Sequence, residues 1–243
     1  WPQKFISSKV YFMPIEFLIF LTVFTPALVG GLNLIFNKNP NVRDTVTLVG
    51  ALITFYFSAN IFLGFDGKAT QYKLATIMPG IDISFHIEPL GIVFSLLASG
   101  LWILTHIYAI GYMRGAKEKN HSRFFFFFSV SIASVMGISF SGNLFTLFLF
   151  YELLTLITFP LVSHKGSSEA LRGARVYLSI LLGTSIGLQL LGIIWIYFSI
   201  GSLDFVKGGI LNGSFGSLEL IILVGLFAFG IGKAALFPFH RWL

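Results

Sequence analysis

The sequence predicts an all-α, polytopic integral membrane protein with about seven transmembrane helices, forming a single membrane domain over residues 1–243. Three observations predict this class. The first is the composition of the 243 residues, of which 56% are hydrophobic and only 11% are charged, and the second is the mean hydropathy of +0.86. A soluble domain carries about 25% charged residues, so these side chains could not cover a water-exposed surface. The third observation is a series of long apolar stretches separated by polar turns.

Each of these stretches is long enough to cross a bilayer, which takes about 20 apolar residues. An open sheet leaves backbone groups unpaired in lipid, so each stretch is predicted to be a helix. The predicted helices cover residues 14–36, 45–63, 90–112, 124–140, 144–162, 176–200 and 218–239. In the fourth of them, the small residues Ser129, Ala133, Gly137 and Ser141 recur every four positions. This spacing predicts close packing against a neighbouring helix.

The loops predict an orientation, because basic residues gather on the cytoplasmic side of membrane proteins. One set of alternating loops holds Lys38, Arg43, Arg114, Lys117, Lys119, Arg123, Lys165, Arg172, Arg175 and Arg241. The other set holds Lys4, Lys9, Lys68, Lys73 and Lys207. We therefore expect the first set inside, the N-terminus outside, and a location in the cell (inner) membrane. Orientation also accounts for the net charge of +6, and no nucleic-acid partner is expected.

The sequence offers little for cofactor or metal chemistry. It has no Cys, which excludes disulfides and thiolate ligands. Nucleotide-binding, zinc-protease and nucleophile-elbow motifs are also absent. We expect neither a cofactor nor a metal, and an activity on a small substrate has no support.

Two ionisable residues stand inside predicted spans. Glu152 lies near the middle of 144–162, and Lys233 lies in 218–239. Each charged group costs roughly 2.5 to 3.5 kcal/mol at the centre of a bilayer, so such residues usually mark ion pathways. A nearby carboxylate stabilises a buried ammonium, and neutralising that carboxylate releases its proton. The pair is predicted to act as a proton switch, although a protonated Glu152 that only bonds a neighbouring helix is the structural alternative.

Polar neighbours suggest how protons reach the pair. Thr155 and Thr158 follow Glu152 toward the predicted cytoplasmic end, although Thr hydroxyls often bond only their own helix. His240 follows Lys233 and is a candidate relay residue. His106 is interpreted as an interior hydrogen-bonding group.

The stretches around these residues resemble the antiporter-like membrane subunits of Mrp-type cation/proton antiporters, respiratory complex I and membrane-bound hydrogenases, and most closely the MrpD component of the antiporters. The resemblance rests on EPLGIVF, LWIL and YAIGYMRG within residues 88–115, on NLFTLFLFYELLT at 143–155, and on GKAALFPFHRWL at 232–243. It covers the chain from about residue 88 to its end.

The resemblance implies about fourteen helices with inverted repeats, of which this chain would be an N-terminal fragment holding the first half. It also implies that Glu152 and Lys233 form the ion pair of a proton channel, and that the helix carrying Lys233 is interrupted after this residue. The expected partners are other membrane subunits of an antiporter or redox complex, the lipid bilayer, protons and Na⁺.

Three alternatives stay open at this level. The chain could belong to an NADH-quinone oxidoreductase or hydrogenase complex, and so to an enzyme. It could be a scaffold subunit that moves no ions. Seven helices with a lysine in the last also fit a retinal-binding protein, but residues 90–112 hold no carboxylate to serve as its counterion.

Overall fold

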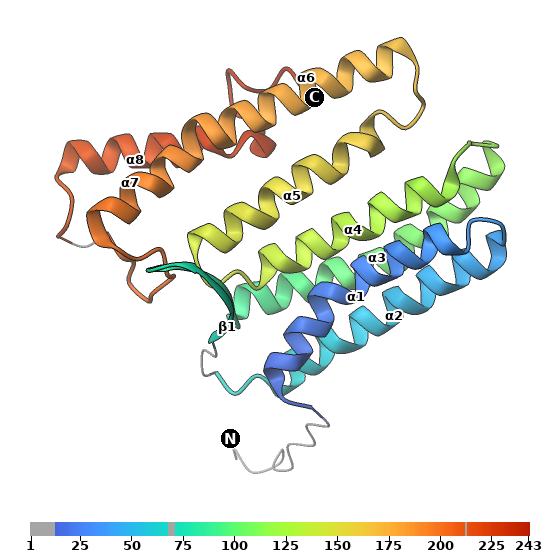
Figure 1. Ribbon diagram of the computed structural model, residues 1–243, viewed down its shortest axis with the longest axis horizontal. Helices are drawn as coiled ribbons and strands as arrows, with labels where there is room; N and C mark the ends of the chain where they lie inside the picture. The colour runs from blue at the N-terminus through green and yellow to red at the C-terminus, as the bar shows by residue number, and fades with distance from the viewer. Residues whose placement is uncertain (1–12, 68–70, 212) are drawn as a thin grey trace, which may run out of the picture.

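The computed structural model describes residues 13–67, 71–211 and 213–243 (Figure 1). Lys4, Lys9 and Lys68, which entered the charge count, lie outside the described residues. The helices are α1 (Ile15–Ile35), α2 (Pro40–Gly64), α3 (Pro89–Gly115), α4 (His121–Ser139), α5 (Leu144–Val162), α6 (Ser168–Thr184), the π-helical segment η1 (Ser185–Gln189), α7 (Leu190–Ile200), α8 (Ser217–Gly230) and the 3₁₀ turn η2 (Gly232–Ala234). Two strands, β1 (Gln71–Met78) and β2 (Ile81–His86), join α2 to α3.

The helices form a bundle in which α1 packs on α2 and α4, α3 packs on α2 and α4, and α5 joins α4 to α6. Figure 1 shows the α1–α2, α3–α4 and α5–α6 connections at one end and the hairpin, the α4–α5 turn and the α7–α8 loop at the other. The chain therefore alternates between two ends, as the predicted spans require.

The predicted fold class is confirmed. Within the described part of the chain, six helical segments are long and apolar enough to cross a membrane, and the sixth runs from Ser168 to Ile200 through η1. α8 is a shorter apolar helix of 14 residues. The protein is thus a multi-pass, mostly helical membrane protein.

The last predicted helix, 218–239, is shorter than expected. The resemblance implied a helix interruption after Lys233. α8 ends at Gly230, so the interruption comes before Lys233. A Cβ at Gly230 would lie 2.7 Å from the backbone nitrogen of Gln189. The glycine therefore lets the end of α8 touch the backbone of η1, which hydropathy alone does not reveal.

The residues after this break turn back toward the bundle. The indole Nε1 of Trp242 donates to the carbonyl of Gly232 at 3.0 Å, and its ring meets Tyr177 of α6 edge to face. Arg241, which the charge count assigned to the segment after the last predicted helix, is exposed in this part of the chain.

The hairpin β1–β2 was not predicted, because its short strands alternate only weakly between polar and apolar residues. Its antiparallel strands carry an ion pair between Lys73 and Asp82 of 2.5 Å. The hydrogen bond from Lys73 is the main cause that lowers the pKa of the partly buried Asp82 carboxyl.

The hairpin also fixes the start of α5. Asn143 caps this helix, since its Oδ1 accepts from the backbone nitrogen of Thr146 at 2.7 Å. Its Nδ2 donates to the Asp82 carbonyl and to the Ser84 hydroxyl of β2, at 2.8 and 2.9 Å. The helix that carries Glu152 is therefore anchored at this end.

The small-residue face of α4 packs closely, as predicted. Ser129, Ala133 and Gly137 are buried. A Cβ at Gly137 would lie 2.3 Å from Cδ1 of the Phe150 ring, so only glycine lets α5 approach α4 this closely.

Candidate functional site

Glu152 lies halfway along α5 and is partly buried. Both carboxylate oxygens are screened from solvent, and neither has a hydrogen-bond partner among the described residues. The polar groups that act on it electrostatically are the Ser185 hydroxyl and the Lys233 ammonium. An unpaired interior carboxylate is costly, which marks this position as one where a proton or a cation compensates the charge.

Lys233 reaches α5 from the turn that follows α8. Its ammonium donates to the carbonyl of Tyr151 at 3.1 Å and, through a short hydrogen bond, to the Thr155 hydroxyl. Its backbone nitrogen lies 3.3 Å from the Tyr151 hydroxyl. The helix break therefore allows the lysine backbone and side chain to bind the same face of α5.

Tyr151 was missed by sequence reasoning. The Lys233 ammonium lies 3.5 Å from the centroid of its ring, so the ring face stabilises the cation. The signal in the sequence was its position next to Glu152, but neighbours in a helix point in different directions and the contact with Lys233 depends on the break after α8.

The acid and the base are brought close without direct contact. Glu152 lies between the two residues of α5 that bind Lys233, yet no carboxylate–ammonium distance in the described chain falls within 4.0 Å for this pair. The two groups therefore act on each other through their charges and not through a direct ion pair.

A row of hydroxyl groups continues from Lys233 along α5. The Thr155 hydroxyl donates to the carbonyl of Tyr151 at 3.0 Å, and that of Thr158 lies 2.7 Å from the Tyr177 hydroxyl on α6. Both threonines also bond their own helix, as the structural alternative predicted. The row nevertheless runs from the lysine toward the α5–α6 connection.

The π-helical segment η1 faces the break in α8. Ser185 and Gln189 are buried, and the Oε1 atom of Gln189 has no partner among the described residues. A π-helical turn commonly occurs at functional sites because it offsets the register of one helix face. Here it places two interior polar groups beside the end of α8.

The two candidate histidines are not part of this cluster. His240 is exposed and stacks on Phe237 with ring centroids 5.6 Å apart, so its relay role stays a prediction. His106 is fully buried, and its Nε2 lies 3.1 Å from the carbonyl of Asp44, as expected of an interior group.

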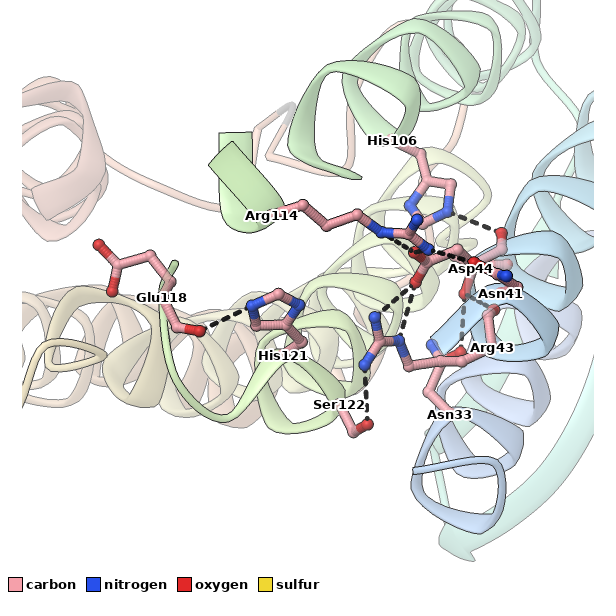
Figure 2. A network of polar contacts seen from close by, with 10 residues as sticks. Asn33, Asn41, Arg43, Asp44, His106, Arg114, Glu118, His121 and Ser122 are labelled. Atoms are coloured by element: carbon pink, nitrogen blue, oxygen red, sulfur yellow. Dashed lines mark hydrogen bonds and ion pairs between the residues drawn. The ribbon is translucent and has the colours of Figure 1, made fainter. Parts of the chain in front are cut away.

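His106 belongs to a second polar cluster at the opposite side of the bundle from α8. Figure 2 shows Arg43, Asp44 and Arg114 at its centre, with contributions from α1 to α4. This cluster was not predicted, since its residues lie near helix ends where charges are common.

His164, in the connection between α5 and α6, is partly buried against Phe124, with ring centroids 5.4 Å apart and an edge-to-face geometry. Burial is the main cause that lowers the pKa of this histidine, and the positive charge of Arg123 acts in the same direction. Within the described ranges, no three His, Cys, Asp or Glu side chains are grouped as metal ligands would be.

A bundle of membrane-spanning helices with an interior acid and base on neighbouring segments defines the class of polytopic membrane proteins with buried ionisable groups. Two family models match this chain. Residues 141–243 match the membrane domain described as NADH:quinone oxidoreductase/Mrp antiporter, and residues 78–125 match the complex I chain 5 N-terminus. The chain belongs to the antiporter-like membrane subunit family.

Curated relatives agree with this family. An Na(+)/H(+) antiporter subunit A1 of Staphylococcus aureus is 31% identical over 216 residues, which is 86% of this chain and 26% of that protein. The chloroplastic NAD(P)H-quinone oxidoreductase subunit 5 of Ipomoea purpurea is 30% identical over 244 residues, which is 92% of this chain and 34% of that protein. The chain thus spans about a quarter to a third of these relatives. Neither is an MrpD component, so that finer resemblance is not confirmed.

One solved structure shows the same fold. A chain of the membrane-bound sulfane sulfur reductase, an archaeal respiratory membrane complex, superposes with a TM-score of 0.77 at 21% identity. The match covers 91% of this chain and 35% of that one. Neither matching family model describes a retinal-binding protein, so the comparisons do not support the retinal-binding alternative.

Proposed function

We propose that this chain is part of a proton-translocating membrane subunit of a multi-subunit cation/proton antiporter, with Glu152 and Lys233 as its proton switch. The observation that carries the proposal is the unpaired, solvent-screened carboxylate of Glu152 beside an ammonium bound to the same helix. Family membership supports it, because the matching family model and a relative both name antiporters.

The switch follows from charge and solvation. While Glu152 is ionised, its charge stabilises the Lys233 ammonium across the gap between them. A proton that arrives at Glu152 removes this stabilisation. Among the described residues, the ammonium is then held by the Tyr151 carbonyl, the Thr155 hydroxyl and the Tyr151 ring. Lys233 releases its proton more readily in that state. Each proton taken up at the acid thus favours release from the base.

The hydroxyl row gives protons a route to the base. Thr155 contacts the ammonium, and Thr158 with Tyr177 extends toward the α5–α6 connection. By the distribution of basic loops this end faces the cytoplasm, with the protein in the cell membrane and its N-terminus outside. His240 would extend the route on the other side of Lys233.

The test uses Glu152→Gln and Lys233→Ala in the full-length protein assembled with its partner subunits. Proton flux in inverted membrane vesicles is expected to fall by about a hundredfold in each variant, as for the loss of a proton-transferring group. The exposed Glu169→Gln and Lys207→Ala serve as matched controls and should keep normal flux. Unchanged flux in both site variants would favour a scaffold subunit.

A second host complex is supported by the relative named NAD(P)H-quinone oxidoreductase subunit 5. In that setting the same switch would be driven by electron transfer in partner subunits. Vesicles separate the two possibilities: proton movement that starts on addition of Na⁺ indicates antiport, and movement that starts on addition of NAD(P)H and quinone indicates the redox complex.

A further inference from the structure

The second polar cluster is centred on one carboxylate that binds two arginines (Figure 2). The Asp44 Oδ1 atom lies 2.7 Å from Nη2 of Arg43, and its Oδ2 atom lies 2.5 Å from Nη2 of Arg114. Arg114 also donates to the side-chain oxygen of Asn41 at 3.0 Å. The cluster joins α2 to the last turn of α3.

This cluster carries an excess positive charge. Two guanidinium groups share one carboxylate, and the side chains of Arg43 and Asp44 are only 3% and 6% exposed. Arg114 is 44% exposed, so its guanidinium is the charged group through which the cluster reaches the surroundings. Interior charge that is not neutralised is costly, which favours binding of an anion from outside.

Some buried N–H donors of the cluster also lack a hydrogen-bond acceptor. The Nδ2 atom of Asn33 is buried without a partner, although its Oδ1 accepts from Thr47 at 2.7 Å. The Nη2 atom of Arg43 has its ion pair with Asp44 but no hydrogen bond of good geometry. Buried donors without acceptors usually indicate a missing water or ion.

The surroundings indicate which anion would fit. Residues 36–44 and 114–123 hold six basic and two acidic residues, giving this end of α1–α4 a net charge of +4. The positive-inside rule explains why the net charge at this end is positive, but it does not explain why two arginines bind one interior carboxylate. Nearby helix surfaces expose large apolar side chains, including Val49 and Ile53 of α2 and Leu104 and Ile107 of α3. A ligand with a phosphate next to acyl chains matches both features.

We infer that the outward N–H groups of Arg114 bind the phosphate of an anionic phospholipid at this end of the α2–α3 pair. The Nε and Nη2 groups of Arg114 donate to Asp44 and Asn41, which fixes the orientation of the guanidinium. Its Nη1 group takes no part in these bonds and supplies the donors for phosphate oxygens. The acyl chains then lie along the apolar surfaces of α2 and α3. Arg114 is the specificity-determining contact, and Arg43 supplies the buried charge behind it.

The experiment measures lipid binding to the full-length protein purified in a neutral detergent. Native mass spectrometry counts bound phosphatidylglycerol and, separately, phosphatidylcholine with identical acyl chains. Phosphatidylglycerol is expected to bind the native protein about tenfold more tightly, and Arg114→Gln should abolish the preference. Lys117→Gln removes the same charge from the adjacent loop without touching the cluster, so it should change binding less than about twofold.

Two further arms complete the test. Arg114→Lys keeps the charge but loses the planar guanidinium, and its affinity for phosphatidylglycerol is expected to fall by about threefold or more. If Arg114→Gln does not fold, Arg114→Lys takes its place in the comparison with Lys117→Gln. Equal losses in Arg114 and Lys117 variants would overturn the proposal in favour of diffuse attraction. Inorganic phosphate or glycerol 3-phosphate is added as a competitor, and displacement at millimolar concentration would assign the site to a soluble phosphate compound and not to a lipid.

Discussion

Gly230, the last residue of α8, is the position where one added methyl group tests how the helix break holds Lys233. A Cβ there would lie 2.7 Å from the Cβ and the backbone nitrogen of Gln189, and 2.9 Å from its Cα. Carbon atoms in contact are about 3.5–4.0 Å apart, so Gly230→Ala must displace α8 from η1 by about 1 Å. Backbone atoms cannot change rotamer, which leaves no local way to relieve the clash.

The cost of such overpacking is about 1–3 kcal/mol, which corresponds to a melting temperature lower by about 2–12 °C. Lys233 follows three residues later, and a displacement of 1 Å at a proton-transfer group lowers rates by up to about a hundredfold. Thermal unfolding in detergent and proton flux in vesicles measure the two effects. The matched control is Gly225→Ala on the same helix, where a Cβ meets nothing within 4 Å.

The comparison with Gly225→Ala removes the general effect of alanine on helix stability, which acts in both variants. If Gly230→Ala melts at the same temperature as Gly225→Ala and transports as fast, the close contact between α8 and η1 does not hold the break, and the reasoning is refuted.

Two other predictions concern stability. Burial lowers the pKa of His164 below its usual value of 6.5, so the folded state favours the neutral ring and stability falls as the pH drops from about 6.5 through the lower folded pKa. His164→Gln should therefore reduce the difference in melting temperature between pH 8 and pH 5, while His240→Gln, an exposed change, should leave it as it is. Gly137→Ala places a methyl group inside the ring that packs on α4, and should cost about 1–3 kcal/mol in thermal unfolding, whereas Gly111→Ala, with open space, should not destabilise.

Each of these has a clear contrary result. A pH dependence that persists unchanged in His164→Gln would mean that another group titrates in that range. Equal melting temperatures for the Gly137 and Gly111 variants would show that α4 and α5 separate without cost, against the close packing described above.

The spans could be predicted because a bilayer selects for length and apolarity, and both are local properties of the sequence. The interior charges Glu152 and Lys233 were found for the same reason, since a charge within an apolar stretch is visible without coordinates. The hairpin β1–β2 was missed, because its hydrogen bonds to Asn143 and Thr146 join segments about 60 residues apart.

The break in α8 shows where hydropathy stops being informative. Apolar residues continue on both sides of Gly230, so the stretch 218–239 was predicted to be one helix. The contact of Gly230 with η1 and the hydrogen bond from Trp242 to Gly232 accompany the end of the helix, and both join residues that hydropathy does not relate. The direction of the Lys233 side chain, and with it the role of Tyr151, depends on that contact.

By itself, then, the sequence determined the membrane environment, the spans and the identity of the two interior ionisable residues, because these follow from how much each stretch costs to place in lipid. The tertiary structure decided which groups meet: Lys233 with Tyr151 and Thr155, and Arg114 with Asp44. Contacts of this kind depend on helix breaks and close backbone approach, which are set by packing between distant segments.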